Sequence, residues 1–156
     1  MPTVEDSITI RAPREAIFAL SQDYGLRLEW DPFVRALRFP NGETEAAQNV
    51  SVWVRAKNGL TMTVKFTTFQ PPERVAMTMT EGPFIFTHFA GTWRFEQRDE
   101  AETLVTFRYG FQCRRLLAPL LTPLVRRVFQ KDVHDRLVAL KSAAEQTDIL
   151  ERLARR

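Results

Sequence analysis

The segment LLTPLVRRVFQKDVHDRLVALKSAA, residues 120–144, decides the fold of this chain. Its apolar residues recur every three or four positions and form one stripe: Leu121, Val125, Phe129, Val133, Leu137, Leu140 and Ala144. A period of about 3.6 residues is typical of an amphipathic helix, so the segment predicts one long helix with an apolar face. Pro119 and Pro123 stand at its beginning and leave its first residue open.

The residues before this helix predict a series of β-strands. Apolar and polar side chains alternate, as in half-buried strands, over residues 4–11, 34–39, 50–55, 60–66, 75–79, 84–97 and 103–113. Asn58-Gly59 lies between two of these stretches and is a strong hairpin signal. After the first stretch, residues 13–20 and 24–30 predict two short helices.

A sheet and one long helix must bury their apolar faces against each other. One helix covers only part of six or seven strands, so the sheet has to curl around it. We expect the curl to leave a cavity lined with apolar side chains, although a filled core would give the same periodicities. The 156 residues fit one domain. We expect it over residues 1–147, followed by a basic tail at 148–156.

Three motifs resemble one known superfamily. They are SITIRAPREAIFAL at residues 7–20, LEWDPFV at 28–34 and FAGTWRF at 89–95. In order and spacing they are similar to the helix-grip superfamily called SRPBCC, which includes START domains, pollen-allergen-like proteins and polyketide cyclase/dehydrase-like proteins. The resemblance covers nearly the whole chain, including the terminal helix.

This resemblance implies an α+β helix-grip fold. A curved antiparallel sheet of six to seven strands would wrap around the long C-terminal helix, and two short helices would follow the first strand. It also implies an apolar cavity that binds lipids, sterols, polyketides, quinones or hydrophobic signals. Some members are aromatases or cyclases and others are carriers, and the superfamily has no universal catalytic motif to carry over. Fold alone does not separate these roles.

The candidate cavity residues come from the inward strand faces and the helix stripe. Tyr109, Thr87 and Arg126 are the polar candidates that could orient a ligand, and Ala90-Gly91 is the expected position of a strand bulge. The full expected lining is Trp30, Phe33, Val52, Val54, Met62, Val64, Met77, Thr87, Phe89, Trp93, Phe107, Tyr109, Arg126, Phe129, Val133 and Leu137. Tyr109 and Arg126 each have a structural alternative, as a core tyrosine and as a side chain that reaches solvent.

The sequence predicts no catalytic residue, metal site or cofactor. His88 is expected on the outer sheet face and His134 at the flank of the long helix. Neither histidine stands at metal-ligand spacing from the other or from Cys113. The six glycines form no phosphate-binding loop.

Charge and cysteine content limit the partners and the compartment. The net charge is +3, with the excess arginine in the C-terminal part, and there is one cysteine, which predicts a reducing, cytoplasmic location. We see no signal peptide and no membrane-spanning run.

We therefore expect a protein that binds a hydrophobic small molecule. One alternative is a cyclase- or aromatase-type enzyme. The other is a basic module for RNA, a ribosome or an acidic membrane, with transient membrane contact. We expect no DNA partner, and the sequence does not indicate an oligomeric state.

Overall fold

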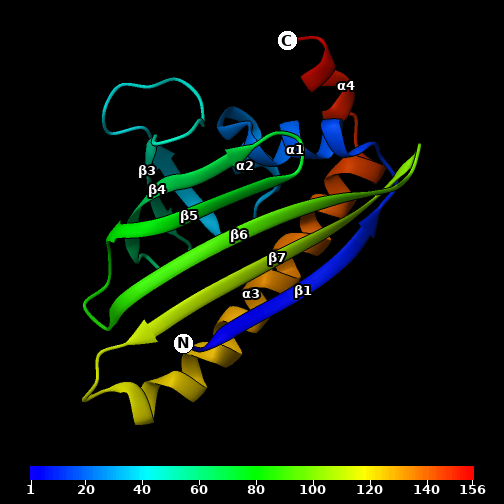
Figure 1. Ribbon diagram of the computed structural model, residues 1–156. Helices are drawn as coiled ribbons and strands as arrows, with labels where there is room; N and C mark the ends of the chain where they lie inside the picture. The colour runs from blue at the N-terminus through cyan, green and yellow to red at the C-terminus, as the bar shows by residue number, and fades with distance from the viewer.

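The computed structural model describes residues 1–156 and has a seven-stranded antiparallel sheet curled around one long helix (Figure 1). The strands are β1 (Thr3–Ile10), β2 (Val34–Arg38), β3 (Ser51–Ala56), β4 (Thr61–Gln70), β5 (Arg74–Glu81), β6 (Phe86–Asp99) and β7 (Glu102–Cys113). The helices are α1 (Arg14–Gln22), α2 (Tyr24–Trp30), α3 (Ala118–Gln146) and α4 (Ile149–Ala154). The expected α+β helix-grip fold, with two short helices after the first strand, is confirmed.

The sheet order is β1-β7-β6-β5-β4-β3-β2, which brings the first strand beside the last. Consecutive strands from β2 to β7 pair as hairpin neighbours, and the predicted turn at Asn58-Gly59 joins β3 to β4. Gly59 has φ +90°, which a residue without Cβ adopts at little cost. The Asn58 side chain accepts a hydrogen bond from the backbone N–H of Leu60 at 3.0 Å and fixes the turn.

The bulge in β6 lies earlier than expected. The register against β7 shifts between Phe86 and His88, not at Ala90-Gly91. An extra residue at this point reverses the faces to which Phe86 and Thr87 point. As a result Phe86 is buried on the concave face, and Thr87 is exposed with its hydroxyl donating to the backbone oxygen of Gln112 at 3.3 Å.

Side chains of α3 cover the outer edge of β1. Arg126 donates to the backbone oxygen of Thr3 at 3.4 Å, Gln130 to that of Glu5 at 3.2 Å, and Lys141 to that of Thr9 at 2.7 Å. These oxygens would otherwise be free acceptors on a sheet edge. The helix therefore holds the sheet through polar contacts as well as through its buried apolar residues.

Residues 149–154 of the expected tail form the helix α4. Ile149 is buried, and Arg152 contacts Glu29 at the end of α2 with an N–O distance of 3.0 Å. Arg156 contacts Asp23, the residue between α1 and α2, at 2.6 Å. The C-terminal residues thus hold the two short helices against the end of α3. None of the four helices is both long enough and apolar enough to cross a membrane.

Candidate ligand cavity

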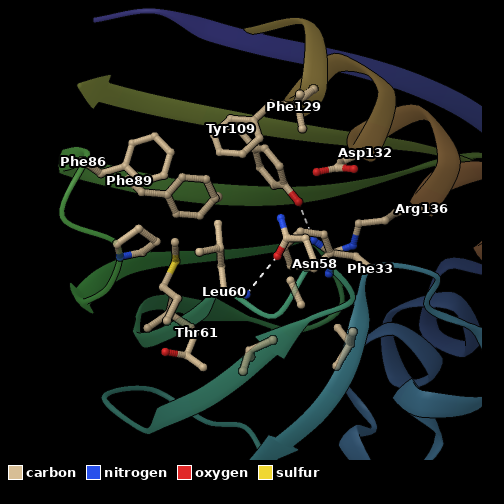
Figure 2. A pocket seen from close by; sticks show the side chains of 18 of the residues that line it. Phe33, Asn58, Leu60, Thr61, Phe86, Phe89, Tyr109, Phe129, Asp132 and Arg136 are labelled. Carbon is tan, nitrogen blue, oxygen red and sulfur yellow. Dashed lines mark hydrogen bonds between the residues drawn. The ribbon is translucent and has the colours of Figure 1, made fainter. Parts of the chain in front are cut away.

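A cavity of about 260 Å³ lies between the concave face of the sheet and the first half of α3. Of its 28 lining residues, 21 are hydrophobic, and Figure 2 shows how those it labels surround the space. The cavity exists because α3 crosses only part of the sheet. Against β7 the helix packs closely, whereas between α3 and strands β2–β5 side chains leave room.

Aromatic rings form the wall between β6, β7 and α3. The centroid of Phe129 on α3 lies 5.7 Å from that of Phe86, 5.4 Å from that of Phe89 and 5.1 Å from that of Tyr109. The Phe86–Phe129 pair is stacked and the other two pairs are edge-to-face, and both arrangements stabilise rings beyond the effect of their buried area. The wall is therefore well defined before any ligand enters.

Gly91 makes room in the floor of the cavity. It pairs with Tyr109 on β7 and Met77 on β5, and a Cβ at this position would lie 3.8 Å from atoms of Met77, Phe107 and Tyr109. This is ordinary van der Waals contact, so a side chain would fit here only by extending into the cavity. Because Gly91 has no side chain, this part of the cavity stays unfilled.

A buried charge cluster closes one end of the cavity. The carboxylate of Asp31, which follows α2, is fully buried and accepts hydrogen bonds from Arg136 on α3 at 2.8 and 3.2 Å. Arg27 on α2 donates to the same carboxylate at 3.2 Å, and its other terminal nitrogen donates to the backbone oxygen of Ser21. Arg136 also donates to the Tyr109 hydroxyl, as Figure 2 shows.

These contacts determine the protonation states at this end. Burial alone would raise the pKa of Asp31, but the charges of Arg136 and Arg27 outweigh it and hold that pKa below its ordinary value. Burial raises the pKa of Tyr109 despite the neighbouring guanidinium. Asp31 is therefore an anion at neutral pH, and Tyr109 keeps a proton that it can donate.

Asp132 is a second carboxyl group at this end, one helical turn before Arg136. Its side chain is half-buried beside the cavity, and Figure 2 shows it near Tyr109. Burial raises the pKa of Asp132, with a smaller opposing effect from Arg136. A carboxyl group with a raised pKa beside an apolar space is suited to proton transfer.

Ten of the sixteen expected lining residues lie along the cavity. They are Phe33, Val54, Met62, Val64, Met77, Phe89, Trp93, Phe107, Tyr109 and Phe129. Four others, Trp30, Val52, Val133 and Leu137, are buried in the core instead. Val133 and Leu137 belong to the part of the α3 stripe that turns toward β1 and β7, where no space is left.

Two polar residues that were expected in the cavity lie outside it. Thr87 faces away from the cavity because of the β6 bulge, and Arg126 extends to the edge of β1. The two histidines also lie outside the cavity: His88 faces the convex side, and exposed His134 lies 2.8 Å from the Asp6 carboxylate.

The polar group at the closed end was not predicted from the sequence. Arg136 was counted only among the basic C-terminal residues, yet it follows Phe129 by seven positions, which returns it to within roughly 20° of the same helix face. Asp132, three positions after Phe129, shares that face. This spacing was the available signal, and it was overlooked because charged residues were assigned to solvent.

Comparisons with known proteins agree with the geometry. A family model described as polyketide cyclase/dehydrase and lipid transport matches residues 1–145. No curated protein matches the sequence. Two bacterial structures are similar in fold: the ZhuI aromatase/cyclase of a Streptomyces species (TM-score 0.78, 19% identity, 93% of this chain and 94% of that one) and a START superfamily protein of Mycobacterium smegmatis (TM-score 0.74, 14% identity, 92% and 97%).

A plant enzyme shares the fold at greater distance. A point mutant of norcoclaurine synthase from Thalictrum flavum, in complex with a transition-state analogue, has a TM-score of 0.67 and 11% identity over 89% of this chain and 94% of that one. At these identities the likeness concerns the fold alone.

Proposed function

This chain belongs to the polyketide cyclase/dehydrase and lipid transport family, and from this membership we propose that its cavity binds an apolar small molecule, in a carrier or sensor role. The observation that carries the proposal is the cavity of about 260 Å³ with 21 hydrophobic residues among 28. Its volume is near the lower end of small-molecule sites, roughly 300–1,000 Å³. A lipid fragment, a quinone or a compact polyketide is the class that suits it.

The ligand would be oriented by the closed end. Apolar burial supplies affinity at about 25 cal/mol per Å² and has no direction. Direction comes from the Tyr109 hydroxyl, whose oxygen accepts from Arg136 and whose proton is free to donate. We therefore expect a carbonyl or hydroxyl oxygen of the ligand at Tyr109 and its apolar part against Phe86 and Phe89.

Native mass spectrometry of the purified protein, followed by extraction of any co-purified compound, tests the proposal. A hydrophobic fluorescent dye provides a second measure of occupancy. In Gly91→Leu the new side chain fills the floor, and dye affinity should fall at least about tenfold. Ala90→Leu on the opposite sheet face is the matched control and should bind as the wild type does. Equal affinity in both variants, or no dye binding by the wild type, would contradict the proposal.

Asp132 favours a second candidate, an enzyme of the cyclase or aromatase type. Closing a ring in a polyketide chain and dehydrating it requires a proton to leave carbon and another to reach the departing oxygen. A half-buried carboxyl group whose pKa is raised and a neutral tyrosine hydroxyl supply a base and an acid at one end of the cavity.

Two substitutions separate an enzyme from a carrier. In a carrier, Asp132→Asn and Tyr109→Phe change dye affinity by no more than about tenfold, since each removes at most one ligand hydrogen bond. In an enzyme, both abolish the loss of water from a poly-β-ketoacyl thioester mimic, whose methylene adds to a distant carbonyl to give the hydroxyl that leaves as water. Mass spectrometry measures this loss, and affinity for the mimic remains. A wild type that binds the mimic and returns it unchanged would exclude the enzyme.

A further inference from the structure

Exposed apolar side chains surround the open end of the cavity. Leu116, in the β7–α3 connection, is 95% exposed, and Leu120 and Leu124 at the beginning of α3 are 79% and 58% exposed. Phe84 before β6 is 72% exposed, and Leu60 before β4 is 51% exposed. We call these five residues the rim. Leu60 and Leu124 also line the cavity, so the rim is continuous with its apolar interior.

The rim is held together between two chain segments. Figure 1 shows the β5–β6 connection and the β7–α3 connection at the same end of the sheet. The backbone N–H of Arg114 donates to the oxygen of Ile85 at 2.8 Å, and its guanidinium lies 4.0 Å from the centroid of the Phe84 ring. These two contacts join the two connections and hold the Phe84 ring in place.

The segment that carries the three rim leucines has charge of one sign. Residues 114–130 contain four arginines, Arg114, Arg115, Arg126 and Arg127, and no aspartate or glutamate. Arg115 and Arg127 are exposed, whereas exposed Arg126 extends to the edge of β1. Leucines that reach into solvent between exposed arginines form the pattern of a surface that lies in the interface of an anionic bilayer.

We propose that the rim docks on anionic lipid membranes and that the ligand passes between bilayer and cavity there. The passage of ligand rests on the proposed function, whereas the docking does not. A second copy of this chain is a poorer occupant, because a two-fold contact through this face would place arginines against arginines. An anionic bilayer buries the leucine side chains in its apolar region and places negative headgroups beside the arginines.

Vesicle co-sedimentation tests the docking directly. The probes are vesicles of phosphatidylcholine alone and of phosphatidylcholine mixed with phosphatidylglycerol. The wild type should bind the mixed vesicles, and added salt should weaken binding because it screens the arginines. The double variant Leu116→Ser/Leu120→Ser should lower the partition coefficient at least about tenfold, since both side chains lose their buried position in lipid.

Matched controls use residues away from the rim. Leu28→Ser/Val138→Ser removes two apolar side chains that are 51% and 40% exposed elsewhere and should leave partitioning unchanged. Arg115→Gln/Arg127→Gln should lower partitioning at least about tenfold, because each arginine contributes roughly fivefold near an anionic surface. Arg98→Gln/Arg155→Gln, at two other exposed sites, should not.

Failure of docking and failure of ligand binding give different results. Gly91→Leu should lose dye binding and keep vesicle binding; a wild type that binds vesicles but no dye supports docking and contradicts the cavity function. No wild-type binding to anionic vesicles overturns the docking, as does an equal loss in the control pairs. If light scattering shows a dimer that Leu116→Ser/Leu120→Ser abolishes, the rim binds a second copy of the chain and the docking proposal is overturned. If the protein binds RNA in a salt-sensitive manner and does not bind vesicles, the rim binds nucleic acid and the proposal is likewise overturned.

Discussion

Arg136 on α3 donates a hydrogen bond to the hydroxyl of Tyr109 on β7, and this contact joins the helix to the sheet at the closed end of the cavity. The same guanidinium holds the buried Asp31 carboxylate, so three distant segments of the chain meet at one side chain.

Neither tyrosine should ionise in the folded protein at pH 10. The chain has two tyrosines, Tyr24 and Tyr109, and burial raises the pKa of both above the ordinary 10.0. The folded state then binds protons more tightly than the unfolded state, and stability is lost as pH rises through the folded pKa. Absorbance of tyrosinate should appear only together with loss of near-ultraviolet circular dichroism. In Tyr109→Phe its amplitude should halve. Tyrosinate in a protein with native circular dichroism at pH 10 would contradict the burial of these rings.

Removing Arg136 should cost more than removing any exposed ion-pair partner. In Arg136→Met the Asp31 carboxylate remains buried with Arg27 as its one ionic partner, and breaking a buried pair costs about 3 kcal/mol. Urea unfolding measures the loss. Lys131→Met, which breaks an exposed pair with Asp135 on the same helix, should leave the urea midpoint nearly unchanged. Equal effects would mean that the cluster contributes no more than a surface contact.

Acid should weaken the wild type more than Arg136→Met. The pKa of Asp31 in the folded state lies below its unfolded value of about 3.9, so its pairing stabilises above that pH and is lost as pH falls through the folded pKa. With Arg136 removed, the pKa of Asp31 should move back toward its ordinary value, and the loss on acidification should shrink. Urea unfolding from about pH 5 downward measures both slopes. Parallel slopes would contradict the role assigned to Arg136.

The C-terminal helix α4 should be necessary for full stability. Ile149 is 2% exposed, so Ile149→Ala should lower the free energy of unfolding by about 2–4 kcal/mol, whereas Arg155→Ala on the exposed side should change it little. Thermal unfolding of both variants measures the difference. An unchanged Ile149→Ala would mean that residues 148–156 behave as the loose basic tail expected from the sequence.

Much of the fold could be predicted because periodicity reports the facing of side chains. The stripe from Leu121 to Ala144 gave the long helix, and Asn58-Gly59 gave the β3–β4 hairpin; both are confirmed. A β-bulge has no comparable pattern in the sequence. Nothing in the composition of residues 86–88 distinguishes the observed register shift from regular pairing, so Thr87 was assigned to the wrong face.

The polar part of the site could not be predicted for a related reason. A helix stripe records which side chains are apolar, but not which part of it faces a space and which part faces a packed sheet. The cavity-facing residues of α3, such as Val128 and Asp132, are centred roughly 120° away from Arg126, and Arg136 lies among them. Which part of α3 faces the cavity depends on where β1 pairs with β7. This pairing joins strands that lie far apart in the sequence.

The polar contacts from α3 onto β1 explain how the sheet can stay open. A curved sheet ordinarily disposes of its free edge by closing into a barrel, and a closed barrel this small would be filled by its own side chains. Here Arg126, Gln130 and Lys141 occupy the acceptors that a closing strand would have used. The helix takes the place of that missing strand, and a cavity of about 260 Å³ remains between helix and sheet.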